Sequence, residues 1–207
     1  ASKAAADHMV RAYYKSYGLP VTISNCANCF GPFQYPEKLI PLTIIHLLEG
    51  RPVPLYGDGG QVRDWLHADD HCRGIEYVIE RGAAGETYNL GGLNERPNLE
   101  TVETLCALVD DAFAAAPALA QRFPASPAAK GDPSTGLIIF VADRPGHDRR
   151  YAIDPAKARA ELGFDVVADF KSGLRATVAW YLDNELWWQA IMDDAGYRSW
   201  MTAQYPD

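Results

Sequence analysis

The sequence predicts an α/β protein with a mainly parallel sheet. Strand and helix patterns alternate over the first ninety residues, which is typical of folds in which helices cover a parallel sheet. At 207 residues and 48% hydrophobic, the chain can bury a sizeable core as one large domain or one and a half. A dinucleotide-binding sheet of this kind carries a Gly-rich turn after its first strand, and this sequence has none.

Composition excludes several classes of function. The net charge of -8 argues against general binding to nucleic acid or anionic membranes, since both need an excess of Lys and Arg. An anion must therefore meet a local basic cluster. No apolar run approaches the roughly 20 residues that span a bilayer. Four cysteines without a secretory signal predict a reducing, cytoplasmic compartment.

The chain opens on ASKAAADHMVRAYYKSYG, where Met9, Tyr13 and Tyr17 share one stripe of an amphipathic helix that Gly18 ends. No start methionine or signal peptide precedes it, so the sequence reads as a beginning in the middle. A strand over 21–25 and a helix within KLIPLTIIHLLEG, ended by Gly50, follow.

PVPLYGDGGQVRDWLH predicts two strands around a Gly-Asp-Gly-Gly turn that supplies positive φ. Asp69 or Asp70 is expected to cap a helix that runs through Ile79. ETYNLGG predicts the next strand.

NLETVETLCALVDDAF predicts a helix with Asn98 as its N-cap. Residues 123–136, rich in Ala, Pro and Ser, are expected to form a mobile insertion. TGLIIFV predicts a strand that leads into a charged loop, and Asp154 is expected to cap the short helix that follows. Helices rich in Trp and Tyr are expected from Lys171 onward.

Five stretches, in this order and spacing, carry a specific resemblance: ASK before a helix, NCANCFGPFQYPEKLIP, YGDGGQVRDWLHADDHCRG, GETYNLGG and VADRPGHDRRYAID. They resemble the C-terminal part of the dTDP-glucose 4,6-dehydratase family, within the extended short-chain dehydrogenase/reductases. The resemblance implies an incomplete Rossmann-like fold, the C-terminal half of a doubly wound parallel sheet, with a smaller mixed α/β substrate-binding domain. The NAD-binding part is expected over 1–50 and 61–93, and the nucleotide-sugar domain over 51–60 and 94–207.

The resemblance also implies NAD-dependent chemistry. In the family, a tyrosine of a Tyr-x-x-x-Lys pair removes the proton of the sugar C4 hydroxyl while hydride passes to NAD, and an Asp-Glu pair then eliminates water. Lys3 occupies the lysine position, where its ammonium would hold the nicotinamide ribose and lower the pKa of the tyrosine. The other groups fall upstream of Ala1 in the family. The chain alone is therefore expected to be inactive.

The resemblance implies ten site positions in all. Lys3 and Asn28 are expected to bind the cofactor, and nine positions, Asn28 among them, are expected to bind the substrate. Those expected to contact the nucleotide sugar are Asn28, Lys38, Leu39, Pro54, Tyr56, Arg63, Asn98, Arg144 and His147. Each has a structural alternative. Asn28 could cap a turn, Lys38 and Leu39 could simply begin a helix, and Tyr56 could be ordinary strand packing.

Three further alternatives stay open. Arg63 could pair with Asp58 or Asp64, whereas the family uses this arginine on the diphosphate. The N-cap role of Asn98 explains it as well as a ligand contact does. The resemblance implies that Arg144 and His147 face the diphosphate and nucleoside while Asp148, Arg149 and Arg150 brace their loop. A solvated salt-bridge loop is the alternative.

Cys26 and Cys29 form a Cys-x-x-Cys spacing that suggests a metal or redox site. Because no second such pair exists, we predict a structural pair of small buried residues and no metal site. His46, His67 and His71 are expected to be isolated histidines. In this family Asn-Asn-Tyr commonly stands where this chain has Asn28-Cys29-Phe30.

Two other functions remain open: a dehydratase, epimerase or decarboxylase acting on another nucleotide sugar, and a non-catalytic nucleotide-sugar binding module. Proteins of this fold usually dimerise through the helix that begins at Ser2. Homodimerisation or self-association of the chain is therefore expected.

Overall fold

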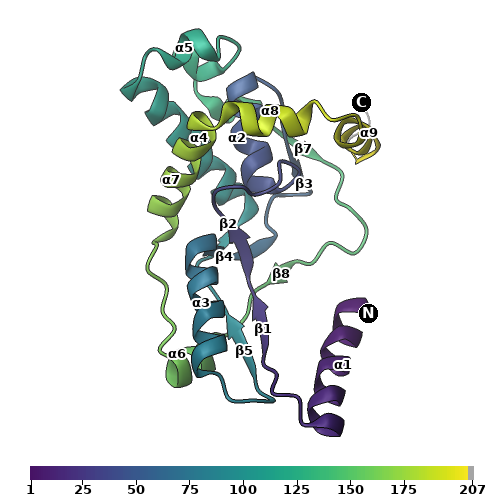
Figure 1. Cartoon of the computed structure of the whole chain (residues 1–207). Coiled ribbons are helices and arrows are strands. Elements are labelled where there is room, and N and C mark those ends of the chain that lie inside the picture. The colour runs from purple at the N-terminus through teal and green to yellow at the C-terminus, as the bar shows by residue number, and fades with distance from the viewer. Residues whose placement is uncertain (205–207) are drawn as a thin grey trace. The chain divides into compact units, whose positions relative to one another are not determined.

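The computed structural model describes residues 1–204, which form two compact units assembled from alternating parts of the chain (Figure 1). Unit 1 comprises Ala1–Cys29, Val62–Glu95 and Arg150–Phe170, and unit 2 comprises Phe30–Gln61, Arg96–Arg149 and the chain from Lys171. The strands with a recorded register pair in parallel. The predicted α/β class with parallel sheets is confirmed.

Unit 1 holds a parallel strand pair covered by a helix. Its helices and main strands are α1 (Ser2–Tyr17), α3 (Ala68–Arg81), α6 (Ala156–Leu162), β1 (Ile23–Cys26), β4 (Val62–His67), β5 (Thr87–Leu90) and β8 (Arg150–Tyr151). β1 pairs with β5 from Ile23 opposite Thr87 to Cys26 opposite Leu90, and α3 contacts both strands. The core of this unit is apolar, and its members include Leu66, Tyr88, Leu90, Leu162 and Phe164.

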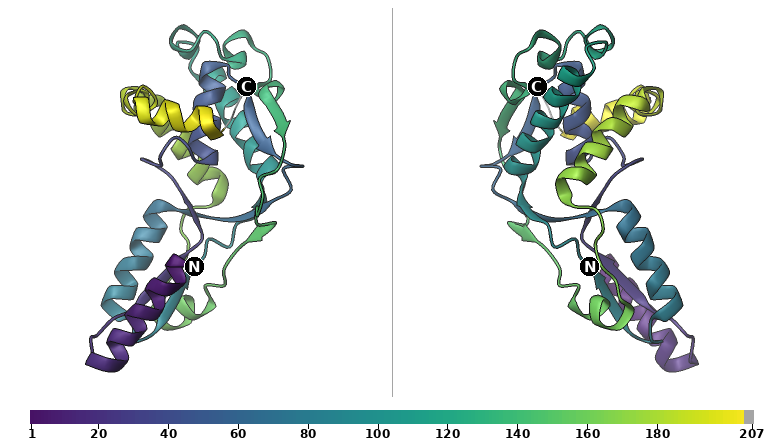
Figure 2. Two further views of the ribbon diagram at one scale, coloured as in Figure 1. Left: turned by 90° about the vertical axis from the view of Figure 1, so that its right-hand side faces the viewer. Right: turned by 90° about the vertical axis from the view of Figure 1, so that its left-hand side faces the viewer.

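Unit 2 is built around two packed helices beside a second parallel pair (Figure 2). Its elements are α2 (Leu39–Glu49), β3 (Val53–Tyr56), α4 (Asn98–Ala115), α5 (Leu119–Arg122), two 3-10 turns (Pro127–Lys130, Ser134–Leu137), β7 (Ile138–Val141), α7 (Phe170–Asp183), α8 (Glu185–Met192) and α9 (Ala195–Gln204). Every residue of α2 from Ile40 to Leu48 is buried, as expected for a helix that is apolar on all sides. The expected C-terminal helices are confirmed.

The two strands around Gly-Asp-Gly-Gly do not form a hairpin. β3 pairs with β7, whereas β4 lies in a sheet of order β2-β4-β6 with β8 beside β4; β2 is Asn28–Phe30 and β6 is Glu95–Pro97. The predicted positive φ is present, at 58° for Gly57 and 69° for Gly59. The turn thus redirects the chain from one sheet to another.

Helix ends were predicted well, and helix starts less well. Gly18 and Gly50 end α1 and α2 in the left-handed conformation, as expected. At the start of α6 the N-cap residue is Pro155, one place after the predicted Asp154, although the Asp154 carboxylate accepts the backbone N–H of Ala156 at 2.9 Å. The predicted cap of α3 by Asp69 or Asp70 is wrong. His67 is the N-cap residue, and its Nδ1 accepts the N–H of Asp69.

The segment expected to be a mobile insertion is packed instead. Phe123, Ser126 and Ser134 are buried, and Ser134 donates to Asp110 of α4 through its hydroxyl at 2.5 Å. The small, Pro-rich residues form compact turns against α4 rather than a free loop.

The division of the chain into an NAD-binding part and a nucleotide-sugar domain stays a prediction. Residues 205–207 of the predicted nucleotide-sugar domain lie outside the described residues. Within residues 1–204, no helix combines the length and apolar character needed to cross a bilayer.

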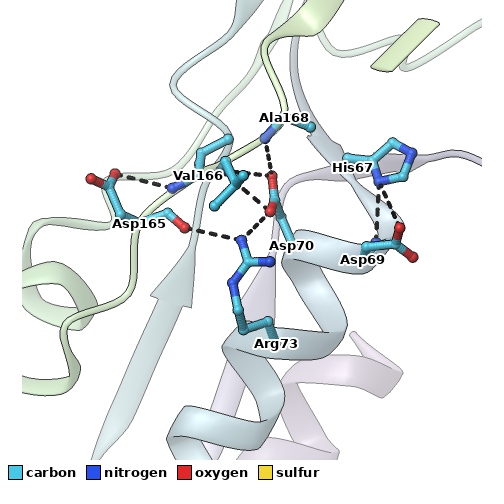
Figure 3. Close-up of polar contacts among 8 residues, drawn as sticks. His67, Asp69, Asp70, Arg73, Asp165, Val166 and Ala168 are labelled. Carbon is cyan, nitrogen blue, oxygen red and sulfur yellow. Dashed lines mark hydrogen bonds and ion pairs between the residues drawn. The ribbon is translucent and has the colours of Figure 1, made fainter. Parts of the chain in front are cut away.

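Asp70 anchors the chain that follows α6 (Figure 3). Its carboxylate is 2% exposed and accepts the backbone N–H groups of Val167 and Ala168 at 3.2 and 3.1 Å. Arg73, one turn later in α3, pairs with the same carboxylate and reaches the carbonyl of Asp165. The buried charge is therefore matched by three donor groups.

We expect Asp70→Asn to lower the free energy of unfolding by about 1–3 kcal/mol, because it removes the charge opposite Arg73 and presents N–H donors to other donors. Urea unfolding at pH 7 measures it. Asp69→Asn makes the same change at the neighbouring residue, whose side chain is 85% exposed, and should stay within about 0.5 kcal/mol of the parent. Equal effects of the two changes would contradict the assignment.

His46 of α2 is buried, and its Nδ1 lies 2.6 Å from the carbonyl oxygen of Pro52. Burial lowers the pKa of His46 to about 4. The unfolded chain takes up a proton at His46 below about pH 6.5, while the folded chain does not until about pH 4. The stability linked to neutral His46 is thus complete above pH 6.5 and is lost as the pH falls.

We expect the free energy of unfolding to fall by up to about 3 kcal/mol between pH 6.5 and 4 through this residue. His46→Leu should flatten that part of the urea-derived stability profile. His8→Gln, at an exposed position of α1, should leave the slope unchanged. A profile that keeps its slope in His46→Leu would show that other groups cause it.

Candidate functional site

Tyr56 and the loop after Val141 meet at one edge of unit 2. Because β3 and β7 are parallel, their carboxyl ends lie together, with Tyr56 opposite Val141. The N–H of Gly57 donates to the carbonyl of Val141 at 2.9 Å. The two loops that leave these strands therefore start side by side.

His147 is the centre of this loop pair. Its side chain is 6% exposed, its ring lies edge-on to Tyr56 with centroids 5.8 Å apart, and its Nδ1 is 2.7 Å from Oδ1 of Asp143. The hydrogen bond from His147 lowers the pKa of Asp143, so the carboxylate is ionised at neutral pH. With Nδ1 donating to a carboxylate, Nε2 is left as the nitrogen that can meet a ligand.

Gln61 completes this group from the other loop. Its Nε2 donates to Oδ2 of Asp143 at 2.9 Å, and its side chain is almost fully buried. Its Oε1 is buried without a hydrogen-bond partner among residues 1–204.

Asn98 stands at the first position of α4, next to the same loop. Its backbone N–H donates to the carbonyl of Gln61 and that of Leu99 donates to the carbonyl of Gly59, both at 2.9 Å. Pro97 is the N-cap residue, so the predicted N-cap role of Asn98 is wrong. Oδ1 of Asn98, in a residue 8% exposed, has no hydrogen-bond partner within the described part of the chain.

The arginines of the charged loop divide into two kinds. Arg149 pairs with Asp58 at 2.8 Å across the two loops, and this contact, with the N–H of Gly60, lowers the pKa of Asp58 to about 2. Arg149 thus braces the loop, as expected. Arg144 is exposed, and its backbone N–H donates to Oδ1 of Asp143 at 2.9 Å.

Arg63 and Arg150 belong to unit 1. Arg63 is 9% exposed and donates to the carbonyl of Val62. The two carboxylates considered as its partners have other ones: Asp58 pairs with Arg149, and Asp64 accepts the N–H groups of Gly92 and Asn94 at 2.9 Å. Arg150 forms a two-point ion pair with Glu95, both contacts 2.7 Å.

Lys3 and Asn28 are also in unit 1. Lys3 is exposed in the first turn of α1, a helix with no buried residue. Asn28 is half-buried in β2, and its Oδ1 is buried without a hydrogen-bond partner among the residues described. The alternative that Asn28 caps a turn through this oxygen is therefore not seen.

Lys38 and Leu39 lie at the start of α2, which agrees with the alternative that they simply begin a helix. Lys38 is the N-cap residue and pairs with Glu37, which offsets its charge. Pro54 lies in β3 opposite Ile139, two residues before Tyr56 and on the same face of the strand.

The structure therefore brings Tyr56, Asn98 and His147 to one loop cluster in unit 2, with Pro54 in the adjoining strand. Gln61 and Asp143 belong to the same cluster and were missed. A polar residue between a Gly-rich turn and a strand was the available signal for Gln61. The signal available for Asp143 was its place four residues before His147, whereas its contact with Gln61, 82 positions away, had no signal in the sequence.

Cys26, Cys29 and His71 form a second cluster, in unit 1. Their potential metal-ligating atoms all lie within 4.8 Å of one another. Hydrogen bonds with Cys29 and then His71 lower the pKa of the Cys26 thiol to about 4, and the same contact with Cys26 raises that of Cys29. Both cysteines are only half-buried. The prediction of a pair of buried cysteines and that of an isolated His71 are wrong.

Comparison with known proteins places these residues in context. A protein-family model described as GDP-mannose 4,6 dehydratase matches residues 1–177. The chain is 52% identical over 198 residues to a dTDP-glucose 4,6-dehydratase of Neisseria meningitidis serogroup B, covering 96% of this chain and 52% of the relative. The enzyme of the same name from Salmonella typhimurium is 47% identical over 205 residues, covering 99% and 52%. The chain spans about half the length of these curated relatives.

Solved structures of dTDP-glucose 4,6-dehydratases are also similar to this chain. A dTDP-glucose 4,6-dehydratase from Bacillus anthracis, in complex with NAD, has a TM-score of 0.78 at 45% identity, covering 92% of this chain and 53% of that one. A double mutant from Streptomyces venezuelae, with NAD and a second ligand bound, gives 0.79 at 43% identity, covering 92% and 52%. The resemblance read from the sequence motifs is confirmed.

The two interpretations of Asn98 predict opposite effects on stability. An N-cap asparagine replaced by alanine costs about 0.5–2 kcal/mol. Asn98→Ala instead removes a buried acceptor that has no partner. We therefore expect its free energy of unfolding in urea to lie within about 0.5 kcal/mol of the parent, or above it. A loss of more than 1 kcal/mol would restore the capping role.

Proposed function

Because the chain belongs to the GDP-mannose 4,6 dehydratase family, we propose that it is part of a dTDP-glucose 4,6-dehydratase, an NAD-dependent lyase that converts dTDP-glucose to dTDP-4-keto-6-deoxyglucose in deoxysugar biosynthesis. The observation that carries the proposal is the pair of buried amide oxygens of Gln61 and Asn98 beside the Tyr56–His147 contact. Buried acceptors without partners cost free energy, so they fit a site that a ligand completes.

The unit 2 cluster offers each group that a nucleotide diphosphate needs. The Tyr56 ring provides flat area for the base or sugar. One of the amide oxygens can accept the N3–H of a thymine base, and the Nε2 side of His147 with Arg144 can meet phosphate oxygens. By the resemblance alone, and separately from the unit 2 cluster, Arg63 is retained as a proposed phosphate contact. Lys38, Leu39 and Pro54 are retained as weaker candidates.

The residues at hand also fit part of an NAD site. The buried, unpartnered Oδ1 of Asn28 can accept a hydrogen bond from the cofactor, and the exposed ammonium of Lys3 can donate to ribose hydroxyls. NAD, when bound, accepts a hydride and returns it to the sugar. Lys3 is the proposed catalytic group of this chain. Its charge would favour the ionised form of the family's Tyr-x-x-x-Lys tyrosine, whose position falls upstream of Ala1.

Three finer points belong to the same proposal. The chain alone is proposed not to complete a turnover, since its 207 residues hold no Gly-x-Gly-x-x-Gly turn. The apolar stripe of Met9, Tyr13 and Tyr17, each more than half exposed on α1, is proposed to support homodimerisation. Four cysteines in the thiol form suit a cytoplasmic location.

Calorimetric titration of the chain with dTDP, UDP and GDP tests the substrate class. We expect dTDP to bind most tightly and Asn98→Ala to weaken its affinity by about 10-fold, the equivalent of one buried hydrogen bond. Glu103→Gln, on an exposed position of the same helix, should leave the affinity unchanged.

Equal affinity for the three nucleotides would favour a dehydratase, epimerase or decarboxylase of another nucleotide sugar. Absence of binding to any of them would overturn the assignment of the unit 2 cluster.

A further inference from the structure

The cluster of Cys26, Cys29 and His71 serves no step of the proposed reaction. It joins the last residue of β1, a residue of β2 and a residue one turn into α3. All three lie in unit 1. Two half-buried thiols and an imidazole within 4.8 Å of one another form a donor set, not a lone reactive cysteine.

The fold holds these residues in place independently of any ligand. α3 packs against β1, which brings His71 toward the end of that strand. The N–H of Ala27 donates to the carbonyl of Leu90 at 3.1 Å, and the hydroxyl of Tyr151 donates to the carbonyl of Cys26 at 3.4 Å. Both contacts hold the peptide group between Cys26 and Ala27, so the start of the Cys-x-x-Cys segment is fixed before its side chains bind a ligand.

The donor set selects the kind of metal. Thiolate sulfur and imidazole nitrogen suit Zn²⁺, whereas Mg²⁺ and Ca²⁺ require oxygen ligands. In a tetrahedral zinc site, bond lengths of about 2.0–2.3 Å place ligand atoms about 3.3–3.8 Å apart. The separations of up to 4.8 Å need only a small inward rotation of the side chains. Three protein ligands leave a fourth position for water.

We propose that Cys26, Cys29 and His71 bind a zinc ion. On binding, the thiols coordinate as thiolates and release their remaining protons to solvent, while neutral His71 donates a ring-nitrogen lone pair. No electron transfer is involved. The ion would bridge the two residues that flank Ala27 and Asn28, and so would restrain the segment that carries the proposed cofactor contact.

Cobalt(II) substitution tests the site without reference to activity. The reduced chain, titrated with Co²⁺, is expected to bind one equivalent at this site and show the sulfur-to-cobalt charge-transfer and visible bands of tetrahedral thiolate coordination, which Zn²⁺ then abolishes. Cys29→Asn, which restores the residue common in the resembling family, and His71→Asn should each weaken binding by more than about 100-fold, since even outer-shell partners contribute about 10- to 100-fold.

Cys72→Ala is the matched control, because Cys72 is exposed and lies beside His71 in the sequence but outside the cluster. It should retain the spectrum and affinity of the parent. Circular dichroism verifies that each variant is folded. Absence of thiolate bands, unchanged affinity in Cys29→Asn, or loss of the site in Cys72→Ala would each overturn the proposal. Formation of a Cys26–Cys29 disulfide without metal uptake, detected by intact mass, would do so as well.

Discussion

Two backbone hydrogen bonds hold the unit 2 site together. The N–H groups of Asn98 and Leu99 would be unsatisfied at the start of α4, but they donate to the carbonyls of Gln61 and Gly59. The helix start is thus satisfied by carbonyls of the loop after β3 rather than by a capping side chain next to the helix. The side chain of Asn98 is therefore free of the structural duty that its position usually carries.

The same two hydrogen bonds determine which groups lie near the amide oxygen of Asn98. With the loop fixed, Gln61 reaches Asp143, Asp143 orients His147, and His147 meets the ring of Tyr56. The parallel register of β3 and β7 supplies the other constraint, because it brings the ends of both strands to one edge. Gln61 Nε2, Asp143 and His147 are each held by a partner. The amide oxygens of Gln61 and Asn98 have no hydrogen-bond partner among the described residues. That combination of rigid support and unmet acceptors is what a binding site requires.

Local signals in the sequence predicted local features. Gly18 and Gly50 end helices because glycine, which has no Cβ, adopts the left-handed conformation of those turns without a steric penalty. The carboxylate of Asp154 accepts the N–H of Ala156, two residues later. Predictions failed where a segment distant in the sequence supplies the hydrogen-bond partner. Asn98 lost its expected role to the carbonyl of Gln61, and the residues after Phe123 are ordered by Asp110. The motifs named the right family, yet their spacing could not show that α3 carries His71 to Cys26 and Cys29.

The central claim is that the loops after β3 and β7, with the start of α4, form a nucleotide-binding surface. Nuclear magnetic resonance of the isotopically labelled chain during titration with dTDP tests it most directly. The account predicts that the largest shift changes fall on residues 56–61, 98–99 and 143–147, including the side-chain amide of Asn98. Saturable changes confined to other parts of unit 2, with these residues unaffected, would contradict it.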